Sequence, residues 1–251
     1  MHFVVRELEE VDSTNTVARG LAEGGCPEGT VILAHSQTAG RGRMGRAWFS
    51  PKGGLWFSLI LRPDMSPQEM GKFPILVGVA MARAIGAASG LPVRLKWPND
   101  IMINGKKAGG ILVESSLLGG KPRYVIVGVG INANVKFEEF PPELKAIATS
   151  VSIEPRELLD AFLQEFAELY EAFKCGGFGD ILLEAKGLSY ILGRPIRAAL
   201  PDGAAVEGVA VDIDDDGALI VELPSGARER FIGGEVSLSL VRPFPYPPLI
   251  Q

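Results

Sequence analysis

The spacing of apolar residues changes near residue 190, and this change limits the folds open to the chain. Before it, long stretches with helical periodicity alternate with short apolar runs. After it only short runs remain, at residues 196–200, 206–213, 218–223, 228–232 and 236–241, separated by Asp202-Gly203, Asp216-Gly217 and Ser225-Gly226. Such pairs between short runs are typical turn signals. The pattern predicts two domains: residues 1–190, and residues 191–251 as a small all-β barrel.

The first domain is expected to mix helices and strands. Strands are predicted at residues 3–8, 31–34, 55–61, 93–96, 101–103, 111–115 and 124–131. Helices are predicted at residues 13–22 behind N-cap chemistry from Ser13-Thr14-Asn15, at 67–88 behind a capping box from Ser66 to Glu69, from Pro155 to about residue 174, and at about 178–188. Asn104-Gly105 and Gly119-Gly120 predict hairpin turns. The fold class is therefore α+β, a mixed β-sheet flanked by helices.

Composition excludes several classes of protein. The 251 residues are 47% hydrophobic and 22% charged, which is enough apolar material for a sizeable core. The net charge of −5 argues against a nucleic-acid partner. Cys26 and Cys175, with only two histidines, cannot assemble a zinc set and are expected to be free thiols in a reducing compartment. The N-terminus lacks the order of a signal peptide, and Arg83 and several glycines interrupt the apolar residues 73–91. We expect a cytoplasmic protein without a membrane partner.

The densest chemical signal is Gly40-Arg41-Gly42-Arg43-Met44-Gly45-Arg46. Three arginines can fork onto phosphate or carboxylate oxygens, and the glycines let the backbone approach a ligand closely. The alternative is a solvated basic loop. The interleaved glycines favour a clamp for a polyanion, which orders when its ligand arrives.

Five further residues carry weaker signals. Asn99 and Asp100, after Lys96-Trp97-Pro98, can face a ligand or a metal, although an ordinary turn is the simpler interpretation. Lys107, before Ala108-Gly109-Gly110, can enter a pocket, although lysines near hairpins are usually at the surface. Asn132 either reads a nucleotide or starts a turn. Trp48 either stacks on a base or anchors the chain.

Other chemistry finds little support. There is no GxxxxGK[ST] motif, and Gly128-Val129-Gly130 is only a fragment of a dinucleotide fingerprint. No cysteine or serine stands in a nucleophile setting. This absence suits a reaction in which the substrate itself attacks.

Taken together and in this order, the segments resemble the biotin–protein ligases (biotin–[acetyl-CoA-carboxylase] ligases). The segments are Ser13-Thr14-Asn15, residues 37–48 with the arginine loop, Lys96 to Asp100, Lys107 to Glu114, and Gly128 to Asn132; the tail Phe231-Ile232-Gly233-Gly234-Glu235-Val236-Ser237 resembles the family's SH3-like C-terminal barrel. The resemblance covers nearly the whole chain. It implies the catalytic fold of the biotin and lipoate ligases.

The resemblance also implies roles. Biotin would be bound by Ser13, Thr14, Asn15, Gln37, Gly40, Arg41, Lys107, Gly110, Ile111 and Leu112. ATP and the adenylate would be bound by Arg41, Gly42, Arg43, Met44, Gly45, Arg46, Trp48, Asn99 and Asn132. Arg43, Lys107 and Asp100 would be catalytic, with Arg43 on phosphate, Lys107 between the biotin carboxylate and the α-phosphate, and Asp100 near a metal or the acceptor lysine.

The implied activity is adenylation of biotin by ATP with Mg²⁺, followed by transfer to a lysine of a biotin carboxyl carrier protein. The metal ligands stay open, and the resemblance suggests a homodimer through the central sheet. His35 stands where the family commonly has an acidic residue. Nothing precedes the first strand, so a ligase without a helix-turn-helix module and without operator binding is expected.

Three other functions remain to be weighed. A lipoate–protein ligase shares the adenylation logic, but lipoyl has no ureido group for Ser13-Thr14-Asn15 to read. A non-catalytic biotin-binding module needs no ATP site, so Arg43, Lys107 and Asn132 would have no ligand to bind. A DNA-binding repressor is disfavoured by the acidic net charge.

Overall fold

A computed structural model describes residues 1–199 and 205–239. Seven strands form one sheet in the order β1-β2-β3-β7-β6-β5-β4. β1 runs parallel to β2, and the other neighbouring pairs are antiparallel, so the sheet is mixed as predicted. Its strands are β1 Val4–Val11, β2 Thr30–Gln37, β3 Leu55–Leu61, β4 Val93–Lys96, β5 Asp100–Ile103, β6 Lys106–Leu118 and β7 Lys121–Ile131.

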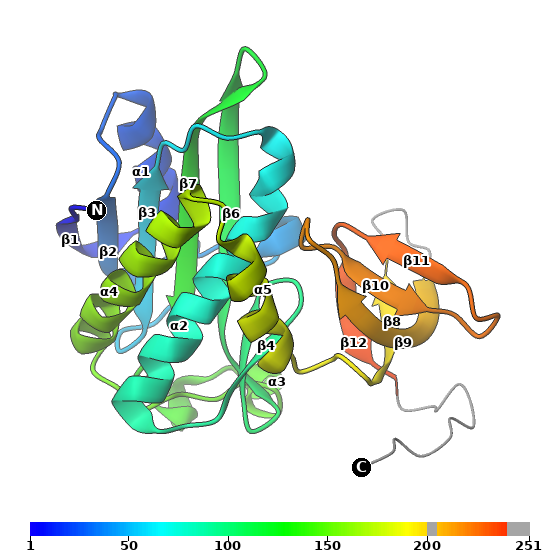
Figure 1. The fold of residues 1–251 in the computed structure, drawn as a ribbon. Helices are drawn as coiled ribbons and strands as arrows, with labels where there is room; N and C mark the ends of the chain where they lie inside the picture. The colour runs from blue at the N-terminus through cyan, green and yellow to red at the C-terminus, as the bar shows by residue number, and fades with distance from the viewer. Residues whose placement is uncertain (200–204, 240–251) are drawn as a thin grey trace.

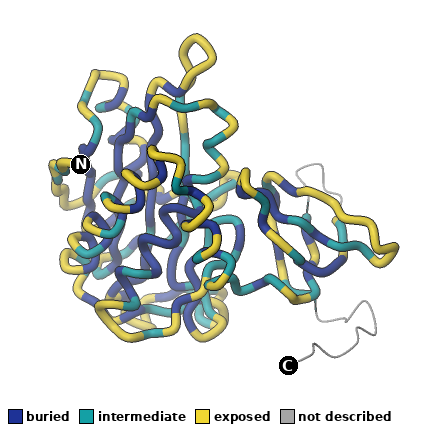
Figure 2. The backbone as a smooth tube through the Cα atoms, viewed as in Figure 1, coloured by how far each residue is buried: buried dark blue, intermediate teal, exposed yellow. Residues whose placement is uncertain are grey.

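Helices cover both faces of this sheet (Figure 1). α2 (Phe73–Ser89), α4 (Pro155–Lys174) and α5 (Phe178–Gly187) lie on one face, and α1 (Thr14–Glu23) lies on the other. Val31 and Leu59 belong to the core beneath α2 and α4, whereas Ile32 and Ile60 pack with α1. Successive positions of β3 are therefore apolar except for Ser58, and the sheet is buried along its middle (Figure 2).

The helix predicted over residues 67–88 is not continuous. A 3₁₀ segment, Pro67–Lys72, precedes α2, which begins at Phe73. Pro74 has no backbone N–H, and its ring would clash with the carbonyl of residue 70 in a continuous α-helix. The predicted capping box is confirmed: the Ser66 backbone N–H donates to Glu69 Oε2 at 3.1 Å.

The helical stretch Pro67–Ser89 is also apolar and long enough, on those two criteria, to cross a membrane. The arginine and the glycines within residues 73–91 therefore do not, by composition alone, exclude a membrane-spanning helix. In the structure 61% of its most apolar window is buried. Packing in the core accounts for this apolar character.

The predicted N-cap chemistry at the start of α1 is not made. Ser13 occupies the N-cap position with extended backbone, but its side chain forms no capping hydrogen bond. Its carbonyl accepts from the N–H groups of Thr16 and Val17. The polar side chains at this helix start are used elsewhere, in the cavity described below.

The remaining segments of the first domain are short. They are the 3₁₀ turns Arg43–Gly45 and Phe137–Glu139 and the helix α3, Pro142–Lys145. Both predicted hairpin turns are present: Asn104 and Gly105 have φ of 49° and 78° and link β5 to β6, and Gly119-Gly120 links β6 to β7. Both cysteines are free, as expected.

The C-terminal domain is a five-stranded antiparallel sheet in the order β11-β10-β9-β8-β12. Its strands are β8 Pro195–Ala199, β9 Ala205–Ile213, β10 Leu219–Glu222, β11 Arg228–Phe231 and β12 Glu235–Leu238. Within the described residues β11 and β12 are not paired, so the expected barrel is an open sheet there. The predicted Asp202-Gly203 turn and the strand and domain ends at residue 200 and beyond residue 239 lie outside the described residues.

The two domains touch directly. Trp97 Nε1 donates to the carbonyl of Gly217 at 2.9 Å, and Lys186 Nζ lies 2.7 Å from Asp212 Oδ1. The predicted boundary near residue 190 lies in the segment between α5 and β8. These contacts seat the C-terminal sheet beside the site.

Candidate active site

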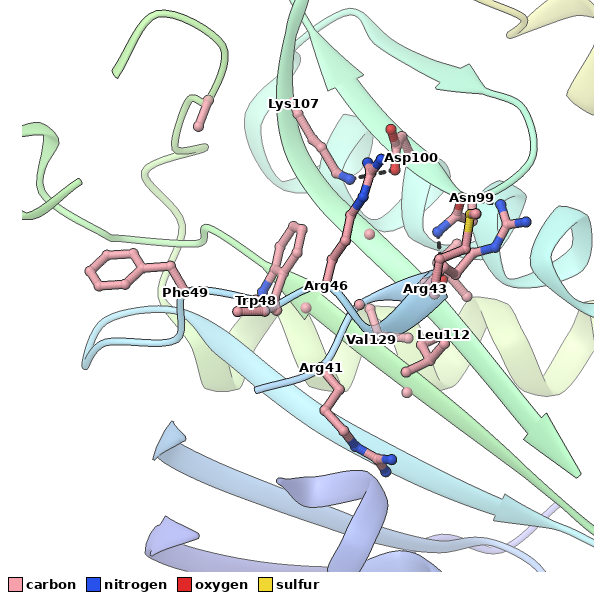
Figure 3. Close-up of a pocket in the computed structure, with 18 of the residues that line it drawn as sticks. Arg41, Arg43, Arg46, Trp48, Phe49, Asn99, Asp100, Lys107, Leu112 and Val129 are labelled. Carbon is pink, nitrogen blue, oxygen red and sulfur yellow. Dashed lines mark hydrogen bonds and ion pairs between the residues drawn. The ribbon is translucent and has the colours of Figure 1, made fainter. Parts of the chain in front are cut away.

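One cavity of about 270 Å³ gathers most of the predicted site residues (Figure 3). Its walls come from the start of α1, the arginine loop, the strands β5, β6 and β7, the segment before α4, and the C-terminal domain. The predicted residues in its lining are Ser13, Thr14, Asn15, Gln37, Arg41, Gly42, Arg43, Met44, Arg46, Trp48, Asn99, Asp100, Lys107, Gly110, Ile111, Leu112 and Asn132. Gly40 and Gly45 are not part of the lining.

Gly40 and Gly45 instead shape the arginine loop. A Cβ on Gly40 would lie 2.5 Å from the Trp48 carbonyl oxygen, so only glycine fits there. Met44 and Gly45 have φ of 56° and 73°, which turns the loop back on itself. The Gly42 N–H then donates to the Arg46 carbonyl at 2.7 Å. The loop is a closed turn that presents its side chains to the cavity.

Each arginine of the loop has a different partner. Arg41 Nη2 lies 3.2 Å from Glu114 Oε2, Arg46 pairs with Glu235 of the C-terminal domain, and Arg43 Nη1 donates to Asn99 Oδ1 at 3.0 Å. Among the described residues no carboxylate lies within ion-pair distance of Arg43, and partial burial lowers its pKa although Asp100 and Glu235 raise it. A partly desolvated guanidinium paired only with an amide is well suited to bind an anion.

Lys107 and Asp100 form the second charged element. Lys107 Nζ lies 2.6 Å from Asp100 Oδ1, and Lys96 Nζ lies 4.0 Å from Asp100 Oδ2 (Figure 3). The hydrogen bond from Arg46 lowers the pKa of Glu235, so this carboxyl group is ionised at neutral pH. This end of the cavity therefore has more cations than carboxylates, which suits phosphate groups.

Trp48 forms a wall of the cavity. Its ring lies against Gly110 and Gly130: a Cβ on Gly130 would approach Trp48 Nε1 to 2.6 Å. Lys107 Nζ lies 5.1 Å from the ring centroid, a cation–π contact. Trp48 Nε1 is buried without a hydrogen-bond partner among the described residues. The indole is packed in place, as an anchor would be, while it still lines the cavity.

The two asparagines beside the cavity serve partly as supports. Asn99 Nδ2 donates to the Ile111 carbonyl at 2.8 Å, so its oxygen faces Arg43. Asn132 Nδ2 donates to the Thr149 carbonyl at 3.0 Å, and this ties the segment before α4 to the end of β7. Asn132 therefore anchors a segment distant in sequence and also lines the cavity.

The opposite end of the cavity is polar and buried. Thr14 and Asn15 are each 4% exposed, and Ser58 on β3 is fully buried. Ser58 Oγ lies 2.8 Å from Thr14 Oγ1 and 2.6 Å from Asn15 Oδ1. The Thr14 backbone N–H donates to Gln37 Oε1 at 2.8 Å. This network can bind the polar head group of a small molecule.

Three contributors were not predicted from the sequence. Ser58 and Glu114 support the polar end from outside the set of expected side chains, and Glu235 reaches the cavity from the C-terminal domain. Glu114 and Glu235 fall inside segments that carry the resemblance, but nothing in their local spacing places them at the site. No cluster of three or more His, Cys, Asp or Glu that could hold a metal occurs in the described parts of the chain.

Comparisons with known proteins agree with this architecture. Residues 7–132 match the biotin/lipoate A/B protein ligase family, and residues 191–239 match the biotin protein ligase C terminal domain. The bifunctional ligase/repressor BirA of Bacillus subtilis is 41% identical over 237 residues, which are 92% of this chain and 72% of that protein. The biotin–[acetyl-CoA-carboxylase] ligase of Paracoccus denitrificans is 36% identical over 241 residues, 90% of this chain and 100% of that protein.

A solved structure shows the same fold. The biotin protein ligase from Aquifex aeolicus, in complex with biotin and ATP, superposes with a TM-score of 0.80 at 31% identity and covers 94% of this chain and 98% of that one. The fold predicted from the resemblance is therefore confirmed. The order of the motifs, the cavity that they form and these matches lead to one conclusion: this chain belongs to the biotin/lipoate A/B protein ligase family, as a biotin protein ligase with the family's C-terminal domain.

Proposed function

We propose that this protein adenylates biotin with ATP and transfers the biotinyl group to a lysine of a biotin carboxyl carrier protein of a carboxylase. The observation that carries the proposal is the single cavity in which a buried polar network and a cluster of cations face each other. A vitamin head group fits the first, and a carboxylate next to a nucleotide fits the second. The relatives named as biotin ligases support the same activity.

In the first step the biotin carboxylate attacks the α-phosphorus of ATP, the bond to the β-phosphate oxygen breaks, and pyrophosphate leaves. Lys107 is placed to stabilise the carboxylate and the α-phosphate, and Arg43 the phosphate oxygens. Catalysis of this kind rests on positioning and on charge stabilisation. The arginine loop covers the mixed anhydride that forms and keeps water from it.

We propose that Mg²⁺ binds together with ATP and is not held permanently by the protein. Mg²⁺ is commonly held by one or two carboxylates together with substrate phosphates, and Asp100 is a carboxylate in the cavity wall that can serve in this way. When bound with ATP, the ion would neutralise phosphate charge. The pairing of Asp100 with Lys107 means that the lysine must turn toward the anions when the carboxylate takes another partner.

In the second step the acceptor lysine, as a free amine, attacks the biotinyl carbonyl, an amide forms and AMP leaves. The amine loses one proton as the amide forms. Asp100 is placed to orient the incoming amine and to accept a hydrogen bond from it. No covalent bond to the enzyme is needed.

Location and assembly are proposed on less direct grounds. Two free cysteines suit a reducing cytoplasm. A homodimer through the central sheet is supported by the family resemblance and by β1 and β4, which are the edge strands of the described sheet. Sedimentation of the protein with and without biotin and ATP tests the assembly.

The experiment that tests the activity uses mass spectrometry and a pyrophosphate assay together. The protein is incubated with MgATP, a biotin carboxyl carrier domain, and either biotin or lipoate. We expect pyrophosphate release and a biotinylated lysine with biotin only. Modification with lipoate would favour the lipoate ligase, and biotin binding without pyrophosphate release would show a non-catalytic binding module.

A further inference from the structure

Glu114 lies behind the polar end of the cavity and joins two of its walls. It sits on β6, outside the cavity lining, and its carboxylate receives three donors. Oε2 accepts from Asn15 Nδ2 at 2.7 Å and from Arg41 Nη2 at 3.2 Å, and Oε1 accepts from Arg19 Nη2 at 2.7 Å. One acidic side chain therefore contacts both α1 and the arginine loop.

An ionised carboxylate can only accept hydrogen bonds, so it determines which way the Asn15 amide faces. The amide NH₂ must point to Glu114, and the amide oxygen must point to Ser58. A reversed amide would place an oxygen against the carboxylate. The Asn15 amide packs directly against Gly128, where a Cβ would lie 2.2 Å from Asn15 Oδ1, so this position must be glycine for the amide to lie here.

This orientation sets the direction of the remaining hydrogen bonds. Ser58 has a single hydroxyl proton and two oxygen neighbours, Asn15 Oδ1 at 2.6 Å and Thr14 Oγ1 at 2.8 Å. Because Asn15 Oδ1 cannot donate, Ser58 donates its one proton to Asn15 and toward Thr14 it can only accept. The other acceptor near Thr14 Oγ1 is Gln37 Oε1 at 3.2 Å. With either partner the Thr14 proton is used within the network, so Thr14 Oγ1, which lines the cavity, can only accept a hydrogen bond from a ligand.

The same carboxylate places a donor at this end. Arg41 can only donate, and Glu114 holds its guanidinium beside the network. In Figure 3 Arg41 extends away from the Lys107–Asp100 pair. The polar end thus offers an acceptor at Thr14 and a donor at Arg41, which matches the N–H and C=O groups of a urea.

We propose that Glu114 is a positioning residue that sets this hydrogen-bond polarity and thereby selects a ligand with a ureido head group. The inference rests on the proposed function, because biotin supplies the urea. Glu114 acts through Asn15, Ser58 and Arg41 and does not touch the ligand. It is expected to govern the binding of biotin and not the chemical step, which takes place at the Lys107 end.

The test is a cycle of four proteins: the native chain, Glu114→Gln, Asn15→Asp and the double variant. Asn15→Asp places two carboxylates together, and we expect the Kd for biotin to rise about 100-fold or more. Glu114→Gln supplies fewer acceptor sites for three donors, and we expect a rise of about 10-fold or more. The double variant restores the bond between the two residues, since the new amide donates to the new carboxylate, whose other oxygen accepts from Ser58, while Arg41 loses its acceptor on residue 114 as it does in Glu114→Gln. Its Kd should fall well below that of Asn15→Asp, to within about 5-fold of the value for Glu114→Gln.

Calorimetry with biotin alone and with ATP alone supplies the readout, and pyrophosphate release gives kcat and KM. We expect KM for biotin to change while kcat at saturating biotin and the Kd for ATP stay within about 2-fold. Arg19→Gln is the matched control: it removes an ion pair of Glu114 outside the chain of hydrogen bonds and should leave the Kd for biotin nearly unchanged.

The outcomes separate the two proposals. A native protein that neither binds biotin nor releases pyrophosphate overturns the proposed function. A native protein that does both, with a double variant no better than its weaker single variant, overturns the role of Glu114. If Asn15→Asp does not fold, as thermal unfolding would show, the comparison of Glu114→Gln with Arg19→Gln decides, and equal Kd values overturn the inference.

Discussion

The Nζ atom of Lys107 on β6 lies 2.6 Å from Oδ1 of Asp100 on the neighbouring strand β5. This ion pair holds both side chains in the cavity, where each has a separate part in the proposed reaction. In the proposed mechanism Lys107 leaves Asp100 when the anionic substrates bind. On this proposal, nucleotide binding would release Asp100 from its ion pair with Lys107.

Replacing Lys107 with alanine should slow adenylation strongly. The variant loses the cation nearest the expected position of the biotin carboxylate, and among the described residues it leaves Asp100 paired only with the more distant Lys96. We expect pyrophosphate release to fall about 10²- to 10³-fold, the usual effect of losing a group that stabilises charge in the transition state. A near-normal rate in single-turnover assays would contradict the role given to Lys107.

Replacing Asp100 with asparagine should separate the two steps. Transfer from preformed biotinyl-AMP to the carrier lysine should fall about 10²-fold, because the group that accepts a hydrogen bond from the amine is neutralised. Adenylation should change much less, since Lys107 and Arg43 remain. Quenched-flow measurement of both half-reactions checks this, and an equal loss in both would place Asp100 in the first step as well.

Replacing Arg43 with alanine should weaken retention of the adenylate without unfolding the protein. The side chain is partly buried and bonds only to Asn99 within the described residues, so its loss leaves no carboxylate unpaired. We expect biotinyl-AMP to dissociate about 10- to 100-fold faster, as for loss of a charged hydrogen bond. Filter-binding release assays measure this rate. Unchanged retention would remove the clamp from the proposed mechanism.

The contact between Arg46 and Glu235 should depend on pH. Arg46 holds the pKa of Glu235 below its ordinary value in the folded protein. The stabilisation is therefore full at neutral pH and is lost as the pH falls through the usual carboxyl range and below, roughly from pH 5 to pH 3. Because both side chains are largely exposed, it amounts to about 0.2–1 kcal/mol.

The comparison of native protein with Glu235→Gln measures this effect. Their melting temperatures should differ at pH 7 and converge as the pH is lowered. Lys121→Gln is the control, because it removes an ion pair between Lys121 and Asp64 that lies far from the site. A difference between native protein and Glu235→Gln that grows at low pH would contradict the assigned direction.

Replacing Gly130 with alanine should displace Trp48. The added methyl group would lie 2.6 Å from Trp48 Nε1 and 3.0 Å from its Cε2. We expect a shifted tryptophan fluorescence spectrum and weaker adenylate binding, because the indole moves into the cavity. Gly86→Ala is the matched control: it lies in α2 with no atom near its added Cβ and should be neutral or slightly stabilising, by up to about 1 kcal/mol. Equal fluorescence changes in both variants would count against the packing argument.

Local chemistry was sufficient to predict much of this fold. Asn104-Gly105 closes a hairpin because few other pairs accept positive φ at both positions. The capping box at Ser66 forms as its spacing predicts. Two predictions are wrong for physical reasons: Pro74 interrupts the helix predicted over residues 67–88, and Ser13 occupies an N-cap position without capping the helix. In each case a local propensity competed with a neighbouring residue or with the needs of the cavity.

The order of the motifs along the chain was enough to assign the family and to name the side chains that meet in the cavity. The partners of those side chains required the tertiary structure. Glu114 lies 99 residues from Asn15, and Glu235 lies 189 residues from Arg46. A hydrogen bond depends on distance and angle in space, and residues so far apart in the chain carry no local spacing signal of their contact. Only the pairing of the strands and the seating of the C-terminal sheet bring these carboxylates to the arginines and the amide that they hold in place.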